Sequence, residues 1–356
     1  MSELISGTCL TMCPEKERWM REREGLLHIL EIDESTKHRK RPAADPTKTV
    51  KCFARPAAGQ TMPDLSELRP GPVLGLTIRF LFKQVLTRSD INWVVLYDFT
   101  FDRLRAVRQD IIIQRIDTRM SISLFEPIVR FYIYSEQRLC ERDIKEFDPV
   151  INNKHLLECI KHLLALYDEQ EIRERQSYSD ICKELDNWSI TDNRTEMETI
   201  YILLHLGNPT AISRGLELPS IYRSKMVKTA LKISLAWYLR NYARACRMIR
   251  SLPPLLTCAA LCNLRQIRRT SLQIMSSGFN SKNLTFPGLK LQELLLYNDV
   301  SKLKADCELF GLNFTNENVQ FEKSKFKEDV SLATPEAFFN ARELHKLLPE
   351  ILLDSN

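Results

Sequence analysis

The sequence predicts an all-α helical repeat, an α-solenoid, followed by a small α+β winged helix. Two observations predict this fold class. From Val73 to Met275, apolar residues recur at three- and four-residue spacing, in segments separated by short polar or Pro/Gly breaks. After Gly278 the order becomes a short strand, two short helices and a hairpin, which is the order of the latter part of a winged helix.

Length, charge and cysteine usage narrow the class of protein. A chain of 356 residues is long for one compact core, so we expect about two domains or one elongated domain. The 51 Lys and Arg against 46 Asp and Glu give a net charge of +5, which does not by itself indicate a nucleic-acid partner. The ten cysteines are scattered, and neither a signal peptide nor a membrane helix is visible. We therefore expect a soluble protein of the cell interior.

Five segments follow one another along the chain. The segment from Pro14 to Asp33 is predicted to form one charged helix, which packs as an arm on the larger body of the protein. The run "KHRKRP" that follows is interpreted as a nuclear localisation signal, a nucleic-acid arm or simply a solvated surface. The predicted segments are an N-terminal signature with the charged arm (1–35), a basic Pro-rich linker (36–72), the helical-repeat domain (73–275), the winged helix (276–330) and a helical tail (331–356).

The ends of the last elements carry capping signals. "GLKLQELLLYN" and "DVSKLKADCELFG" predict two short helices, the second capped by Asp299 and ended by Gly311. "LNFTNENVQFEKSKF" predicts two strands about an Asn-rich turn. In the tail, Thr334 is the expected N-cap and Pro335 the first helical residue of a closing helix.

Two cysteine-containing groups are candidate metal sites, and in both the structural interpretation is favoured. Cys9 and Cys13 lack two further ligands at zinc-site spacing, and three residues intervene where a thioredoxin-like pair has two. His155, Cys159 and His162 share a helical face, but that helix already has an apolar core stripe which these residues flank. We expect no metal and no cofactor.

The passage "YDFTFDRLRAVRQDIIIQRI" interleaves charges with apolar residues, so several charges must lie close to the buried face of its helix. We expect an ion-pair network in which Asp102 pairs with Arg105 and Asp98 lies on the same side. A catalytic carboxylate is the alternative, but no nucleophile, phosphate-loop or metal motif accompanies it, so we predict no enzyme. The charges of this passage are Asp98, Asp102, Arg103, Arg105, Arg108 and Asp110.

Two basic groups are candidate nucleic-acid contacts, because Lys and Arg on a helix and a wing are what phosphate binding requires. Solvated surface and protein docking are equally good interpretations of these groups. The first group lies on one predicted helix, "WYLRNYARACRMIR", and the second on the predicted recognition helix and wing strand. These residues are Arg240, Arg244 and Arg247 in the first group, and Lys302, Lys304, Lys323, Lys325 and Lys327 in the second.

Several of these passages together resemble the GANP-like, or Sac-three, family, whose members are also described as leucine permease transcriptional regulators. The resemblance covers residues 7–330, and Cys9, Cys13 and Pro14 belong to its opening signature. The matching passages are "GTCLTMCPEKER", "REREGLLHILE", "LRPGPVL", "YDFTFDRLRAVRQDIIIQ", "EPIVRFYIYSEQRL", "LLALYDE", "EMETIYILLHL", "NYARACRMI" and the strand-helix-helix-hairpin end.

The resemblance implies a stack of helices like tetratricopeptide repeats, capped by a winged helix, as in proteins with a PCI domain. It implies a scaffold that binds a PCI-domain protein and a small acidic subunit, and that binds RNA in the large members, which serve messenger-RNA export at the nuclear pore. The chain has no phenylalanine-glycine repeats, long centrin-binding helix or acetyltransferase-like extension, so it most resembles the short animal members.

Those short members are linked to centrosome duplication, spindle assembly and mitotic progression. The first expectation is therefore a scaffold with centrosomal partners in the cytoplasm, at the centrosome and on the spindle, with the nucleus left open. The alternative is a PCI-like RNA-binding scaffold of messenger-RNA export or processing. By position alone, the five lysines of the predicted winged helix would face nucleic acid.

Overall fold

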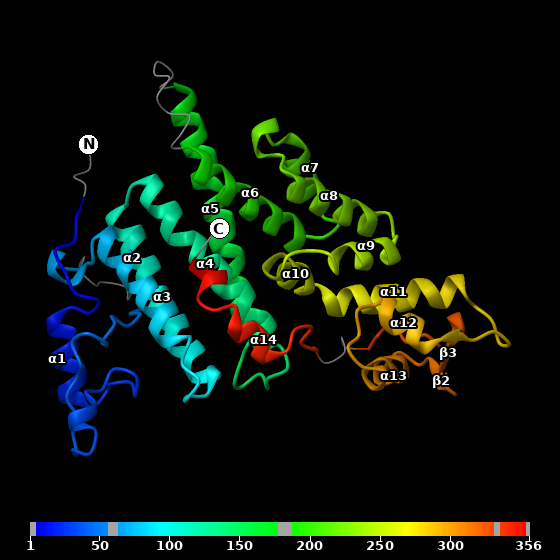
Figure 1. The fold of residues 1–356 in the computed structure, drawn as a ribbon, viewed down its shortest axis with the longest axis horizontal. Helices are drawn as coiled ribbons and strands as arrows, with labels where there is room; N and C mark the ends of the chain where they lie inside the picture. Colours follow the sequence, from blue (N-terminus) through cyan, green and yellow to red (C-terminus); the bar gives the residue numbers. More distant parts are fainter. Residues whose placement is uncertain (1–4, 56–62, 177–186, 331–334, 354–356) are drawn as a thin grey trace. The chain divides into compact units, whose positions relative to one another are not determined.

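The computed structural model describes residues 5–55, 63–176, 187–330 and 335–353, which are predominantly helical and include one small antiparallel sheet (Figure 1). The chain forms two compact units. Unit 1 is built from residues 1–131, 161–178 and 344–356, and unit 2 from residues 132–160 and 179–343. None of the helices that the structure describes combines the length and the apolar character needed to cross a lipid bilayer.

Unit 1 is built around the long helix α3, which presents aromatic side chains to its neighbours. The ring of Phe131 lies 5.8 Å from the ring of Phe82 and 5.8 Å from the ring of Tyr97, and all three side chains are buried. The elements of the first part of the chain are α1 (Glu15–Glu24), two short 3₁₀ turns (Glu34–Thr36 and Leu65–Glu67), α2 (Gly71–Phe80) with a π-turn (Leu81–Val85), α3 (Trp93–Gln114), α4 (Thr118–Leu139) and α5 (Pro149–Gln176).

The N-terminal part differs from its prediction in two ways. Instead of one helix from Pro14 to Asp33, α1 ends at Gly25, whose φ of +69° suits glycine and closes the helix. Residues 36–72, expected to be a linker, contribute Val50, Leu68 and Arg69 to the interior of unit 1, where each is fully buried. This segment is therefore integral to the folded unit over the residues that the structure describes.

Unit 2 contains a series of shorter helices, in which α6 packs against α8 and α8 against α9. The passage predicted as one basic helix is two, because α8 ends at Tyr238 and Arg240 takes a left-handed φ of +62° before α9 begins. These helices are α6 (Asn187–Leu204), α7 (Pro209–Glu217), α8 (Lys225–Tyr238), α9 (Tyr242–Ile249), α10 (Pro254–Leu261) and α11 (Leu264–Gly278).

The sheet lies after α11, in the order predicted from the sequence. Phe286 of β1 and Phe314 of β2 both lie opposite Val319 of the central strand β3. Val319 packs in one buried cluster with Leu291 and Leu303, which come from the two intervening helices. The elements are β1 (Phe286–Pro287), α12 (Gly288–Leu294), α13 (Val300–Leu309), β2 (Asn313–Thr315) and β3 (Asn318–Gln320).

The capping predictions for this region have different outcomes. Asp299 caps α13 as expected, since its carboxylate accepts the Ser301 backbone N–H at 3.0 Å, and Gly311 follows the helix with a φ of +80°. In the tail, Thr334 lies outside the described residues. Pro335 is not helical, contrary to the prediction, because the next helix begins at Ala341. The closing helix is shorter and interrupted, as α14 (Ala341–Lys346) and α15 (Glu350–Leu353).

Candidate functional site

The charged residues of the signature passages meet inside unit 1, around the fully buried carboxylate of Glu31. Arg21 of α1 donates from Nη1 to Glu31 Oε2 at 2.7 Å, and Arg103 of α3 donates from Nη2 to Oε1 at 3.1 Å. The backbone N–H groups of Val50 and His28 also donate to this carboxylate, at 3.0 and 3.2 Å. A buried carboxylate needs such partners, because its desolvation otherwise costs several kcal/mol.

A second buried carboxylate, Asp110 of α3, collects two further segments. Lys51 Nζ donates to Oδ1 and Arg69 Nε donates to Oδ2, each at 2.7 Å. Lys51 Nζ also donates to the Glu67 carbonyl at 2.7 Å, and Arg69 Nη1 to the Met12 carbonyl at 3.1 Å. Asp110 therefore joins the signature segment, the segment predicted as a linker and α3 in one network.

The opening signature is held against the same network by its backbone. The N–H of Thr8 donates to the Leu65 carbonyl at 2.8 Å, and that of Cys9 to the Leu68 carbonyl at 3.0 Å. Gly7 donates to Gln114 Oε1 at 2.7 Å, and a Cβ at Gly7 would lie 2.1 Å from the Leu68 carbonyl oxygen. A glycine is required here by the close approach of two backbones.

The predicted network within α3 has different partners from those expected. Asp102 accepts from Arg103 Nη1 at 2.7 Å, whereas Arg105 lies with its guanidinium 3.8 Å from the centre of the Phe53 ring. Asp98 is exposed, and Arg108 is half-buried on the same helix. Spacing predicted that these charges need partners, but the choice of partner depends on segments far away in the sequence.

Burial lowers the reactivity of two thiols near this network, Cys13 of the signature and Cys52 of the segment that was predicted as a linker. It raises the pKa of Cys13 to about 12 and that of Cys52 to about 11, so both are thiols at neutral pH. Cys13 Sγ instead accepts a hydrogen bond from Arg21 Nη2 at 3.2 Å, while Cys9 Sγ donates to the Thr11 carbonyl at 3.3 Å. These contacts are structural.

The three residues of the predicted cysteine-histidine group have separate contacts. Cys159 is fully buried, His162 lies 4.9 Å from the Phe125 ring, and His155 Nδ1 lies 3.4 Å from the Glu158 carboxylate. Burial and the positive charge of Arg108 lower the pKa of His162. Across the described residues, no group of three or more His, Cys, Asp or Glu side chains is placed to hold a metal ion.

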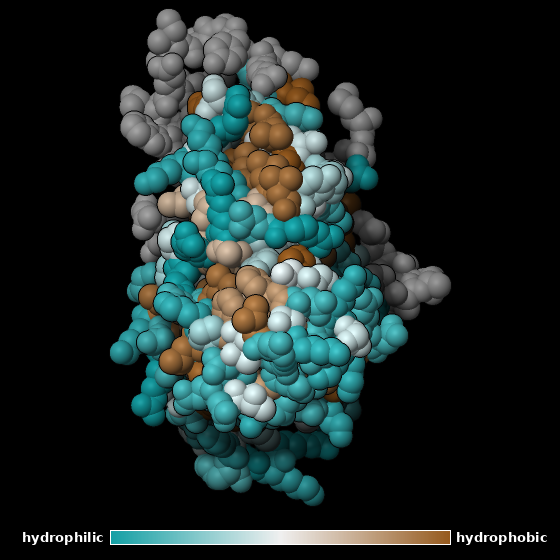
Figure 2. Space-filling view, turned by 90° about the vertical axis from the view of Figure 1, so that its right-hand side faces the viewer, coloured by the Kyte–Doolittle hydropathy of each residue, from teal (hydrophilic) through white to brown (hydrophobic). Residues whose placement is uncertain are grey.

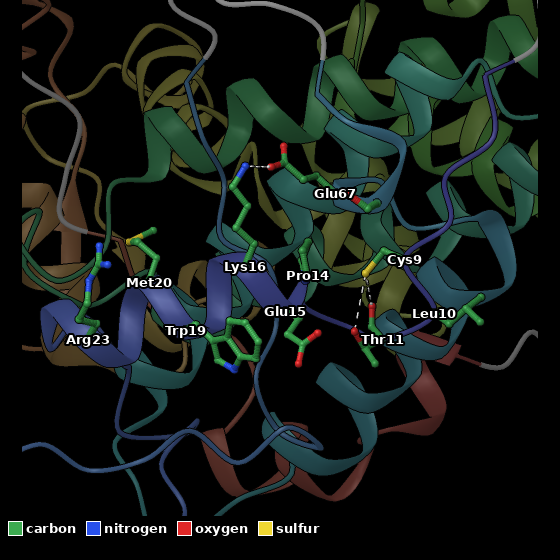
Figure 3. Close-up of a pocket in the computed structure, with 11 residues that line it drawn as sticks. Cys9, Leu10, Thr11, Pro14, Glu15, Lys16, Trp19, Met20, Arg23 and Glu67 are labelled. Carbon is green, nitrogen blue, oxygen red and sulfur yellow. Dashed lines mark hydrogen bonds and ion pairs between the residues drawn. The ribbon is translucent and has the colours of Figure 1, made fainter.

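A hollow of about 770 Å³ lies on the outer side of the signature segment (Figure 3). Trp19 and Met20 project from α1 beside it, and Leu10 lies at the opposite end, with exposed fractions of 61%, 41% and 80%. Lys16 and Glu67 form an ion pair of 3.0 Å across its rim. This hollow offers apolar contact area to a protein partner.

The five lysines predicted as nucleic-acid contacts are divided between a helix and a turn. Lys302 and Lys304 lie on α13 as expected, and Lys304 is 3.9 Å from Glu308. Lys323 and Lys325 lie in a 3₁₀ turn after β3, not in the wing strand, and Lys327 follows that turn. Lys325 is paired with Glu322 at 2.6 Å, so its charge is partly neutralised.

One residue of the predicted arginine group lies in a hollow with two further cations. Arg247 of α9 lines a hollow of about 330 Å³ together with Arg250, Lys290 and the acidic Glu293 of α12, and the apolar Phe286 and Leu294. Arg250 Nη2 donates to the Glu293 carbonyl at 2.8 Å, which fixes its head group at the rim. The Glu293 carboxylate lies 3.8 Å from Arg250 and 4.0 Å from Lys290, so it partly neutralises both, and the net charge of the three cations and Glu293 is +2. Neither Arg250 nor Lys290 was predicted as a contact from the sequence.

The position of Arg250 three residues after Arg247 is visible in the sequence, but Lys290 joins the two arginines only through the fold. The group also loses a predicted member, since Arg240 lies in the α8–α9 turn, while Arg244 is exposed on α9. Figure 2, which turns the right-hand side of Figure 1 toward the viewer, shows brown apolar patches separated by teal hydrophilic residues.

Comparison with known proteins places these segments in one family. The model of the SAC3/GANP family matches residues 12–316. SAC3 family protein 1 of Schizosaccharomyces pombe is 26% identical over an alignment of 349 residues, gaps included, that covers 91% of this chain and 32% of that protein. SAC3 family protein B of Arabidopsis thaliana is 27% identical over 291 residues, 77% of this chain and 16% of that protein.

A third relative, Protein xmas of Drosophila melanogaster, is 29% identical over 185 residues, 49% of this chain and 8% of that protein. The chain thus spans less than a third of the length of these curated relatives. The matched range contains Glu31, Asp110 and the cationic hollow formed by Arg247, Arg250 and Lys290.

Proposed function

The chain belongs to the SAC3/GANP family, and from this premise we propose that it is a non-enzymatic scaffold of messenger-RNA export or processing that binds RNA through unit 2. The observation that carries the RNA contact is the cationic hollow between α9 and α12, where three cations outnumber the single carboxylate of Glu293 beside apolar walls. The cations are Arg247, Arg250 and Lys290. Cations supply the phosphate contacts that dominate affinity for nucleic acid, and apolar walls accommodate bases.

The finer architecture belongs to the same proposal. Region α11–β3 has the order helix, strand, helix, helix and two strands, with the sheet order β1-β3-β2, which supports a winged helix. The helices before it support a PCI-like stack of repeats. By family resemblance, its partners are a PCI-domain protein and a small acidic subunit.

RNA titrations over a range of salt concentrations test the proposal directly. The triple variant R247Q/R250Q/K290Q should bind single-stranded oligouridine at least about tenfold more weakly, and its slope of log affinity against log salt should fall in magnitude by about 2, since three phosphate contacts are lost. The matched control is K225Q/K228Q/K232Q, which removes three exposed charges from α8. Equal affinity and slope in the hollow variant and the unchanged chain would refute the RNA contact.

The scaffold role is tested by its partners. Purification of the tagged full chain from dividing cells, followed by mass spectrometry, should recover a PCI-domain protein and a small acidic protein in amounts comparable to the bait. Their absence from a preparation in which the chain itself is folded would count against the export-type scaffold.

A second candidate is a scaffold of centrosome duplication, spindle assembly and mitotic progression, located at the centrosome, on the spindle and in the cytoplasm. The exposed Trp19 and Leu10 beside the hollow on α1 support a protein-docking surface, which such a scaffold requires, because Trp is enriched among the residues that dominate protein interfaces. W19A should then lose spindle-pole localisation, while L239A, which removes another exposed apolar side chain, should keep it. Unchanged localisation of W19A would reject this docking role.

A further inference from the structure

The loop between Ile32 and Ala44 in unit 1 carries five consecutive basic residues, 37–41, at its exposed tip. We propose that this loop is a second RNA site, which holds neighbouring phosphates of the backbone without reading the bases. The inference rests on the proposed function, in that it requires the chain to bind RNA. It assigns a use to the basic run that the sequence left open between an import signal, a nucleic-acid arm and solvated surface.

The loop is closed at its base by several hydrogen bonds. Ile32 and Ala44 form an antiparallel bridge, and the Asp33 N–H donates to the Ala43 carbonyl at 3.0 Å. Within the loop, the hydroxyl of the buried Thr36 donates to the Asp33 carbonyl and accepts from the Ala43 N–H, each at 2.9 Å. Residues 37–42 therefore form a compact turn whose two ends meet at Thr36.

The base of the loop is hydrogen-bonded to a residue of the buried ion-pair network. The Asp45 N–H donates to the Glu31 carbonyl at 2.8 Å, and the carboxylate of Glu31 is held by Arg21 and Arg103. The Ala44 N–H donates to the Glu22 carboxylate at 3.1 Å. A charge cluster on such a base is pre-organised, so less conformational entropy is lost when it binds a ligand.

The charges at the tip are largely unneutralised. Lys37 is paired with Glu34 at 3.4 Å, and both side chains are well exposed, so the pair is weak. Arg39, Lys40 and Arg41 are exposed, and none of them makes an ion pair with any residue that the structure describes. Three cations confined to one short turn create a local positive potential that attracts closely spaced anionic groups.

The closed turn favours a phosphate backbone over recognition as an extended import peptide. Five extended residues span roughly 17 Å, whereas the ends of this turn are joined by the Thr36–Ala43 hydrogen bond of 2.9 Å. The basic run 37–41 also contains no Asn or Gln, the amides that read adenine edges. A folded cluster of Arg and Lys matches phosphates, which it can contact in any sequence.

The test compares the full chain with the variant R39Q/K40Q/R41Q in salt-resolved titrations of single-stranded oligouridine. The loop variant should lose at least about tenfold in affinity near 50 mM salt, and its salt slope should fall in magnitude by about 2. Because these side chains are exposed, the unfolding midpoint should not change. K225Q/K228Q/K232Q again controls for net charge, and an equal loss in that variant would overturn the assignment of a site to the loop.

A second variant, T36V, opens the loop without removing charge. It should weaken oligouridine binding by about threefold, because the cations are no longer held together. A receptor with an acidic groove for extended basic peptides would instead bind T36V better, and loss of nuclear accumulation by the loop triple with unchanged RNA affinity would overturn the RNA site in favour of that receptor.

The failures of the two ideas are distinguishable. If the unsubstituted chain does not bind oligouridine, the proposed RNA function fails and the loop inference falls with it. If R247Q/R250Q/K290Q loses affinity while R39Q/K40Q/R41Q matches the unsubstituted chain, the function stands and the loop inference alone is overturned.

Discussion

Two buried carboxylates, Glu31 and Asp110, organise the signature passages of this chain. Each has a relative exposure of 0% and accepts hydrogen bonds from two cationic side chains. A buried ion pair contributes little net stability when it is complete, because desolvation offsets the attraction, but removal of one partner leaves charge uncompensated. Glu31 and Asp110 are therefore critical mainly because their removal would leave buried positive charges without a partner.

Replacing Glu31 tests this asymmetry. E31Q keeps the shape of the side chain but leaves Arg21 and Arg103 without their shared counter-charge, so we expect the free energy of unfolding to fall by about 3–5 kcal/mol. Urea denaturation measures it. The control is E34Q, where an exposed carboxylate pairs with Lys37 and the change should stay within about 0.5 kcal/mol. A loss below about 1 kcal/mol in E31Q would contradict the network.

Two glycines test the backbone approach at the signature. In G7A the new Cβ would lie 2.1 Å from the Leu68 carbonyl oxygen, so one of the two segments must move and the free energy of unfolding should fall by about 2 kcal/mol or more. In G278A, at the end of α11, the new Cβ would meet no atom within 4 Å beyond its chain neighbours and the backbone of its own helix, and a small gain of up to about 1 kcal/mol is expected. Equal behaviour of the two variants in thermal unfolding would refute the close approach.

At the scale of elements, α3 begins at a side-chain cap. Asn92 Oδ1 accepts the Val94 N–H at 3.1 Å, which satisfies one of the free donors of the first turn. N92A should lower the free energy of unfolding by about 1 kcal/mol, whereas N92S keeps an acceptor and should lose less. The comparison uses chemical denaturation of both variants, and equal losses would mean that the cap contributes nothing beyond its backbone.

The order of the elements could be predicted from the sequence, because periodicity and capping are local signals. Asp299 and Gly311 fulfilled the roles that their positions suggested on either side of α13. The end of α1 at Gly25 was also a readable signal, which was overridden by the longer charged pattern. The break at Arg240 was missed because a non-glycine residue rarely adopts the left-handed region, although the next residue, Asn241, caps α9 and was a local signal.

The candidate sites were only partly predictable, because partners in space are not neighbours in sequence. Lys51 reads as one more charge in a basic linker, yet it is buried against Asp110, 59 positions away. Arg268 reads as part of a basic run, yet it lies over the Tyr297 ring at 3.7 Å and pairs with Glu336 at 2.8 Å. Charge patterning gives the inventory of cations, and the fold decides which of them remain available to a ligand.

At the scale of the whole molecule, Glu136 of α4 makes the free energy of unfolding depend on pH. Burial raises its pKa from the ordinary 4.5 to about 7, against the lowering effect of the hydrogen bond from Asn152. Between pH 4.5 and pH 7 the folded state binds more protons than the unfolded state. The contribution of Glu136 to the free energy of unfolding is therefore most favourable below about pH 4.5 and decreases as the pH rises to about 7.

Replacement of Glu136 by Gln isolates this effect. E136Q keeps an acceptor for Asn152 and removes the charge, so above pH 7 it should unfold with a free energy up to about 3 kcal/mol higher than that of the unchanged chain, and the gap should vanish near pH 4. The exposed E217Q serves as the control. Denaturation curves across this pH range decide it, and a gap that is the same at both ends would exclude a titrating Glu136.

The contact between Gly7 and Gln114 joins residues that are 107 positions apart. A ribosome adds residues at about 5–20 per second, so the signature segment waits roughly 5–20 s before α3 has been synthesised. During that interval Arg21 and Glu31 have already been synthesised, but Arg103 has not. The apolar side chains around the network are then not yet buried against α3. We therefore expect the speed of translation between residues 7 and 114 to affect the yield of folded protein, because exposed apolar surface favours aggregation.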